Sequence, residues 1–244
     1  MPAAASILPA RLSGISCRFG RKAVLRGVEL ELRGGELVGL LGQNGAGKTT
    51  LFSILVGLLQ PDTGAREFGG QVVADVEVEV RARFAWLAHD PQLYPLLSAR
   101  ENVELYVDLV GEQGRAGHGE APDPLAVLTR LGLGEVVERP VGTFSRGMAQ
   151  RVALARALVL EPELMILDEP FTALDRQGRA LLAELLRAEV ARGACVLLSS
   201  HDLDVVADVV DRAVLLQGGV IADEVARRAG ESSPEFRVRI AAMG

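Results

Sequence analysis

Short, uninterrupted runs of apolar residues recur along the chain, separated by stretches whose apolar positions follow helical spacing. The runs cover residues 36–41, 84–88, 164–167 and 194–200, and the helical stretches cover residues 51–59, 145–160 and 176–192. Short apolar runs of this kind are typical of parallel strands that are buried on both faces. Because these runs alternate with helices, the pattern predicts an α/β fold with a mainly parallel core sheet.

Alternating polar and apolar positions mark a second, antiparallel part of the chain. Residues 12–32 alternate around two glycines, which predicts a hairpin or meander, and residues 72–80 alternate again as a second small β element. Another hairpin is predicted at residues 212–220, with two glycines at its turn. The sequence therefore predicts an antiparallel β subdomain beside the core sheet.

The pattern becomes helical between residues 96 and 133, which predicts a helical lobe at about residues 90–150. Ser98 and Glu101 have the spacing of a capping box at a helix start. Residues 111–124 are rich in glycine and proline without an apolar period, so they are predicted to form an exposed connection. We expect this lobe to be inserted into a single domain that spans residues 1–244.

Composition limits the classes of function. The net charge of −6 argues against a dedicated nucleic-acid binder, so no nucleic-acid partner is expected. Cys17 and Cys195 lie far apart and have no metal-type spacing. The N-terminus lacks the pattern of a signal peptide, and no segment approaches the roughly 18 apolar residues of a membrane span. We therefore expect a cytoplasmic chain that meets a membrane only through a partner.

One glycine-rich stretch follows an apolar run and precedes a helical pattern. It fits the phosphate-binding pattern G-x-x-x-x-G-K-(S/T) and reads Gly42-Gln43-Asn44-Gly45-Ala46-Gly47-Lys48-Thr49-Thr50. In a strand–loop–helix arrangement, free backbone N–H groups converge on an anion at the helix N-terminus. Lys48 is expected to reach the β- and γ-phosphates, and the Thr49 hydroxyl to bind Mg²⁺. The stretch predicts a nucleoside triphosphate site.

Two carboxylates and a histidine follow other predicted strands. Asp168 and Glu169 end the apolar run at residues 164–167, an arrangement that is costly unless a cation lies nearby. We expect Asp168 to hold Mg²⁺ and Glu169 to orient and polarise the attacking water, which would make the reaction hydrolysis of the γ-phosphate. His201 follows another central strand, where its imidazole can bond a γ-phosphate oxygen.

Together these residues resemble the ATP-binding subunits of ABC transporters, and the resemblance covers nearly all of the chain. Phe19 matches the aromatic loop that stacks on adenine, although a strand aromatic there can also pack into the core. Residues 172–175, which end at Asp175, match the D-loop, and His201 matches the switch histidine. The family signature, usually Leu-Ser-Gly-Gly-Gln, is matched by Phe144-Ser145-Arg146-Gly147-Met148.

The resemblance implies an Mg²⁺-dependent ATPase in which two subunits, as a homodimer or a pair, sandwich ATP head to tail. The signature and Asp175 would then contact the nucleotide of the opposite subunit, with Ser145 and Gly147 at its phosphate. The resemblance also implies integral membrane permease subunits as partners and a peripheral position on the cytoplasmic face of the membrane. Glu169 argues against a regulatory module that binds nucleotide without hydrolysing it.

Two departures from the family pattern affect the predicted site. Arg146 and Met148 replace the usual Gly and Gln of the signature. In the Q-loop, alignment on residues 96–102 puts His89 where the family has its glutamine, and Gln92 is the alternative. A histidine there can accept a metal-bound water or donate to a phosphate.

The same departures resemble the haem-exporter ATPases of cytochrome c maturation, which work with membrane subunits. ATPases of drug, lipid and polysaccharide exporters share most of the pattern, and some ABC ATPases work without a membrane channel. Chains of the latter class resemble two fused cassettes or carry a long coiled coil, and neither feature is visible in this sequence.

Overall fold

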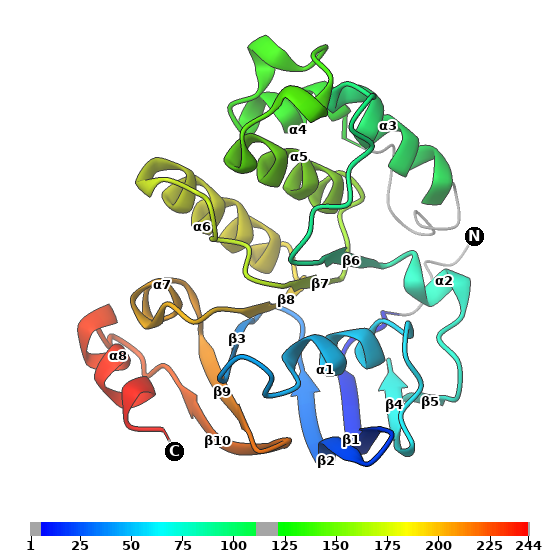
Figure 1. The fold of residues 1–244 in the computed structure, drawn as a ribbon. Helices are drawn as coiled ribbons and strands as arrows, with labels where there is room; N and C mark the ends of the chain where they lie inside the picture. Colours follow the sequence, from blue (N-terminus) through cyan, green and yellow to red (C-terminus); the bar gives the residue numbers. More distant parts are fainter. Residues whose placement is uncertain (1–5, 111–121, 244) are drawn as a thin grey trace.

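The computed structural model describes residues 6–110 and 122–243 and contains two sheets (Figure 1). Most of the connection predicted at residues 111–124, and the extreme N-terminus, lie outside these residues. The antiparallel sheet has the strand order β2-β1-β4-β5, made by β1 (Ala10–Phe19), β2 (Lys22–Leu32), β4 (Thr63–Phe68) and β5 (Gln71–Val73). The other sheet has the order β10-β9-β3-β8-β7-β6 and comprises β3 (Leu37–Leu41), β6 (Phe84–Leu87), β7 (Leu164–Leu167), β8 (Cys195–Ser199), β9 (Arg212–Gln217) and β10 (Val220–Ala226).

Five strands of the larger sheet run parallel, and only β10 pairs antiparallel, with β9. All residues of β3, β7 and β8 are buried, which explains why these strands read as unbroken apolar runs. Both the parallel core and the antiparallel subdomain were predicted, and the structure confirms the fold class.

Helices cover both faces of the larger sheet. Helix α1 (Lys48–Leu55) packs Phe52 between the two sheets, where it meets Val38 and Leu40 of β3. On the other face lie α5 (Arg146–Leu158), α6 (Arg176–Ala191) and α7 (Leu203–Val209). Alternate residues of β3 thus pack into two separate cores. Leu37 and Leu41 belong to the core on the side of α5, α6 and α7.

Helices α3 (Ala99–Val110), α4 (Pro124–Arg130) and α5 form a lobe above β6 and β7 (Figure 1). Short 3₁₀ turns at Gly134–Val136 and Val141–Thr143 connect α4 to α5. The predicted capping box is present, because Ser98 Oγ accepts the Glu101 N–H and Glu101 accepts the Ser98 N–H. The helices of this lobe begin at Ala99 and end at Leu158, whereas the lobe was expected at about residues 90–150.

Three local expectations differ from the structure. The alternation at residues 72–80 is not one β element, because it contains β5 and then the helix α2 (Val78–Arg81). Val76 is buried whereas Val78 is 59% exposed, so alternate valines do not share one face. Helical spacing was predicted over residues 51–59, but helix α1 ends at Leu55, because Gly57 adopts a φ of +77°. The C-terminal helix α8 (Ser233–Ala241) was not predicted at all, and it packs on α7.

No helix within residues 6–110 and 122–243 combines the length and the apolar character needed to cross a bilayer.

Candidate active site

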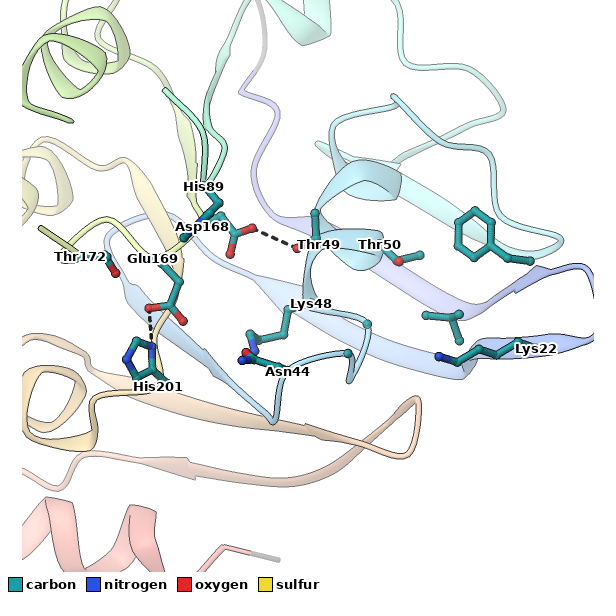
Figure 2. Close-up of a pocket in the computed structure, with 14 residues that line it drawn as sticks. Lys22, Asn44, Lys48, Thr49, Thr50, His89, Asp168, Glu169, Thr172 and His201 are labelled. Atoms are coloured by element: carbon teal, nitrogen blue, oxygen red, sulfur yellow. Dashed lines mark hydrogen bonds and ion pairs between the residues drawn. The ribbon is translucent and has the colours of Figure 1, made fainter. Parts of the chain in front are cut away.

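A cavity of about 780 Å³ opens where β3, β7 and β8 end and α1 begins (Figure 2). It brings together residues that are far apart in the sequence, as expected for the carboxyl edge of a parallel sheet. Its lining consists of Phe19, Lys22, Val24, Asn44, Gly45, Gly47, Lys48, Thr49, Thr50, His89, Asp168, Glu169, Thr172 and His201.

The glycine loop between β3 and α1 forms one wall of this cavity. Gly47 has a φ of +107°, and a Cβ there would lie 2.9 Å from a Leu25 methyl group, so only glycine fits. Lys48 is buried and folds back over the loop, where its Nζ donates to the Gly42 carbonyl at 2.7 Å. Gly42, Gln43 and Ala46 do not line the cavity, although Gln43 and Ala46 border an adjacent one. The loop thus carries a cation among backbone N–H groups at a helix start.

Asp168 and Glu169 follow β7 directly and are held by β8. Ser199 Oγ donates to Asp168 Oδ1 at 2.5 Å and accepts the Glu169 N–H at 2.9 Å. Glu169 adopts a φ of +53°, a conformation that a non-glycine residue keeps only when its surroundings hold it. Asp168 is 6% exposed, so its carboxylate needs these partners.

Oxygen donors from α1 and β7 meet in the cavity. Thr49 Oγ1 donates to Asp168 Oδ2 at 3.0 Å. Hydroxyl and carboxylate oxygens are the ligands that Mg²⁺ takes together with substrate phosphates. Within the described part of the chain, no group of three or more His, Cys, Asp or Glu side chains is placed to hold a metal ion. The two donors therefore fit a cation whose other ligands are phosphate oxygens and water.

His201 lies next to the second carboxylate (Figure 2). Its Nδ1 is 3.0 Å from Glu169 Oε2, which places a hydrogen bond between the residues that follow β8 and β7. The His201 side chain is 72% exposed, whereas that of Glu169 is 14% exposed. The imidazole therefore faces the open side of the cavity, and the carboxylate sits behind it.

The structure separates the two candidates for the Q-loop position. His89 lines the cavity two residues after β6, while Gln92 does not line it. Gln92 has a φ of +49°, and its carbonyl accepts a hydrogen bond from Arg156 at 3.2 Å. His89 therefore borders the same cavity as Lys48, and its role at the Q-loop position stays a prediction.

Phe19 lies at the end of β1 and borders the cavity beside Lys22 and Val24 of β2. Its side chain is 55% exposed, so the alternative that it packs into the core is wrong for this structure. An exposed ring at the mouth of a cavity that the glycine loop also lines offers a flat surface for stacking.

The signature residues 144–148 and Asp175 do not line the cavity of their own chain, whereas Thr172 at the start of the D-loop does. Ser145 is the N-cap of α5 and accepts the Met148 N–H at 3.3 Å, and Arg146 and Gly147 form the first turn. Asp175 is the N-cap of α6 and also pairs with Arg151.

Sequence reasoning missed other residues at the site, among them Ser199 and Lys22. Ser199 ends an apolar run two residues before His201, which was the available signal. Lys22 adds a second cation to the cavity, on the side of Phe19.

A sequence model of the ABC transporter family matches residues 25–172, more than half of the chain. The chain is 38% identical to the molybdenum import ATP-binding protein ModC of Mycobacterium tuberculosis, covering 80% of this chain and 55% of that protein. It is 36% identical to the cytochrome c biogenesis ATP-binding export protein CcmA of Rhodopseudomonas palustris, covering 78% and 92%. It is 35% identical to the Nod factor export ATP-binding protein I of Burkholderia lata, covering 87% and 69%.

Solved structures give the same fold. The ATP-binding subunit of an ABC transporter has a TM-score of 0.81 at 29% identity, over 96% of this chain and 99% of that chain. A dimeric ATP-binding cassette in a post-hydrolysis state, bound to ADP and Pi, has a TM-score of 0.79 at 26% identity, over 90% and 99%. The chain spans about half the length of the molybdenum import protein, so the likeness covers only part of that relative.

Proposed function

The chain belongs to the ABC transporter family, and from this premise we propose that it hydrolyses ATP to ADP and phosphate. One observation carries the proposal: Glu169, hydrogen-bonded to His201 at 3.0 Å, faces the same cavity as Lys48 and the Thr49–Asp168 pair. A carboxylate beside a phosphate loop can accept a proton from water, which is the base that hydrolysis needs.

Each residue has a distinct part in this reaction. Phe19 stacks on the adenine, while the loop N–H groups and Lys48 bind the phosphates and stabilise the charge on the γ-phosphoryl group. Glu169 orients the attacking water and takes its proton. His201 orients Glu169 in the nucleotide-free chain and bonds the γ-phosphate when ATP is bound. Mg²⁺, held by Thr49 and Asp168, would supply charge neutralisation between the β- and γ-phosphates.

Phosphate release by the purified full chain with ATP and Mg²⁺ tests this proposal. Glu169→Gln should lower kcat by about 100-fold or more, because the general base is lost, while ATP binding persists. Glu184→Gln is the matched control, because Glu184 is an exposed carboxylate on α6 that does not line the cavity. A Glu169→Gln chain with nearly normal turnover would remove Glu169 from this role.

Two chains sandwich the nucleotides head to tail in this proposal. The support is the position of Ser145, Gly147 and Asp175 outside their own cavity, together with the dimeric cassette among the similar structures. Met148 and Arg146 replace the usual signature residues and would then lie at the partner's phosphates. Sedimentation of Glu169→Gln with ATP should give a dimer, and a monomer at all concentrations would contradict the arrangement.

The finer assignment is a subunit of the haem exporter of cytochrome c maturation, held on the cytoplasmic face of the membrane by permease subunits. Its support is the 36% identity over 92% of the CcmA protein, together with His89 and the altered signature. Affinity capture from native membranes with Glu169→Gln and ATP tests it. Multi-span subunits of cytochrome c maturation would support haem export, another permease would discard that substrate, and ribosomes or iron–sulfur proteins would indicate a soluble role.

A further inference from the structure

Arg156, on the last turn of α5, joins the helical lobe to the segment that carries His89. We propose that Arg156 is a positioning residue that holds residues 91–92 against the lobe and thereby keeps His89 in the cavity. The proposal rests on the function proposed above, in which the cavity that His89 lines hydrolyses ATP.

The Arg156 guanidinium donates hydrogen bonds to two successive backbone carbonyls. Arg156 Nη2 donates to the Pro91 carbonyl at 3.0 Å, and Nη1 donates to the Gln92 carbonyl at 3.2 Å. Gln92 takes a left-handed φ of +49°, a conformation that is uncommon for a non-glycine residue. The planar guanidinium of arginine presents two N–H groups at a fixed spacing, so it can donate to both carbonyls at once. The ammonium of a lysine lacks this fixed fork.

The ring of Tyr106, on α3, makes a further contact with the guanidinium. The Arg156 Cζ lies 5.3 Å from the centre of the Tyr106 ring, which is within range of a cation–π contact. Burial lowers the pKa of the Arg156 guanidinium, and the nearby Tyr106 and Tyr94 oppose that shift. In the described part of the chain Arg156 makes no ion pair, so its contacts are neutral carbonyls and a ring.

His89 is therefore fixed from both sides. Before it, the Leu87 carbonyl accepts the Asp168 N–H at 2.8 Å, which ties the end of β6 to the first carboxylate of the site. After it, the Pro91 carbonyl is tied to Arg156 on the lobe. Residues 88–90 lie between these two hydrogen bonds and connect the sheet to the lobe. A shift of the lobe against the sheet must therefore move His89.

A neighbouring contact fixes the rest of the segment to the same lobe. Asn102 is buried on α3, where it accepts the Tyr94 N–H at 2.8 Å and donates to the Ser98 carbonyl at 2.9 Å. Asn102 holds residues 94–98, which lie beyond the cavity, and Arg156 holds the part next to His89. Arg156 is therefore the lobe residue that contacts the segment next to His89.

The test compares Arg156→Lys with a matched variant elsewhere in the full chain. Arg227→Lys is the control, because Arg227 also donates to backbone carbonyls, those of Ala207, Val210 and Glu231, and lies 4.6 Å from the Phe236 ring centre. It attaches the C-terminal segment and not the His89 segment. Both substitutions should lower the melting temperature, since each keeps a charge but loses guanidinium hydrogen bonds to backbone carbonyls.

The first readout is the Cε1–H NMR cross-peak of His89, assigned by its loss in His89→Ala. Arg156→Lys should shift this peak in the nucleotide-free chain, and Arg227→Lys should leave it in place. The second readout is a double-mutant cycle on ATP turnover. Arg156→Lys alone should lower kcat by about tenfold with little change in the KM for ATP, because His89 is misplaced while Lys48 and Phe19 are not. In the His89→Ala background the same substitution should cost almost nothing further.

An unshifted His89 peak in Arg156→Lys would overturn the proposal, whether or not the wild-type chain hydrolyses ATP. Losses of kcat that add in the cycle, or normal turnover in His89→Ala, would overturn the claim that Arg156 acts through His89. If the wild-type chain shows no ATP turnover while the peak still shifts, the proposed function fails and the positioning of His89 by Arg156 stands.

Discussion

Ser199 is the residue whose removal tests the construction of the site most directly. Its hydroxyl is fully buried between β7 and β8, where it donates to Asp168 Oδ1 and accepts the Glu169 N–H. Ser199→Ala removes one oxygen and leaves a buried carboxylate oxygen and a buried N–H without this partner. The positive φ of Glu169 loses a hydrogen bond that supports it.

The expected cost follows from these two bonds. A hydrogen bond to a charged group contributes about 1.5–3 kcal/mol, and a buried N–H left unsatisfied costs about 1–3 kcal/mol. The two effects share one oxygen and overlap, so we expect the free energy of unfolding to fall by about 3 kcal/mol. For a chain of this size that corresponds to a melting temperature lower by roughly 6–12 °C.

Urea unfolding measures the loss, with the fluorescence of Trp86 as the signal. Trp86 is the only tryptophan in the sequence and packs edge-on against Phe52, with ring centres 5.7 Å apart. In the same variant kcat should drop by about tenfold, because both carboxylates lose their fixed orientation. The KM for ATP should change little, since the phosphate loop and Phe19 are untouched.

Ser16→Ala is the control for the loss of a serine hydroxyl. Ser16 Oγ accepts one N–H, from Gly27 at 2.9 Å, in an exposed part of the β1–β2 pair, where water can replace it. We expect a loss below about 1 kcal/mol in this variant. The reasoning is refuted if both serine variants destabilise the chain equally, or if Ser199→Ala unfolds at the wild-type urea concentration.

Three further outcomes are expected. Asn102→Ala should lower the free energy of unfolding by about 2–4 kcal/mol, because its buried amide serves several backbone groups of the preceding turn; thermal unfolding measures this. The backbone N–H of Ser98 lowers the pKa of Glu101 from its ordinary 4.5, so Glu101 stabilises the fold above that value. The stability gap between wild type and Glu101→Gln, measured by urea unfolding, should therefore be full at neutral pH and vanish as the pH falls through the lowered pKa. Arg146→Ala should keep the unfolding free energy within about 0.5 kcal/mol, yet weaken the ATP-dependent dimer of Glu169→Gln about tenfold by sedimentation.

The sequence alone predicted the position of those site residues that are consecutive in the chain. The glycine loop, its lysine and the strand before it are consecutive, so the motif carries its own structural context. The same holds for Asp168 and Glu169, because a strand that is buried on both faces and ends in two carboxylates must deliver them to the sheet edge. Their roles in catalysis stay predictions.

What the sequence left out depends on contacts between distant segments. Ser199 reaches Asp168 only because β8 pairs with β7, and nothing in an apolar run specifies its neighbour in the sheet. The valines of residues 72–80 alternate like a strand, but β5 ends at Val73, so Val76 lies in a loop and the last two valines lie in α2. The missed helix α8 had a readable signal, since Ser232 and Glu235 form a capping box with a proline in the first turn.

The signature region shows why the choice of variant matters for any test of a contact between chains. Ser145 caps α5, Asp175 caps α6, and a Cβ on Gly147 would lie 2.8 Å from the Ala173 carbonyl. Substitutions at these three positions therefore disturb the chain itself, and a lost activity would not separate that damage from a lost partner. Arg146 is exposed and makes no hydrogen bond or ion pair within the described residues. An effect of Arg146→Ala on dimer formation, at unchanged stability, must therefore come from the other chain or its nucleotide.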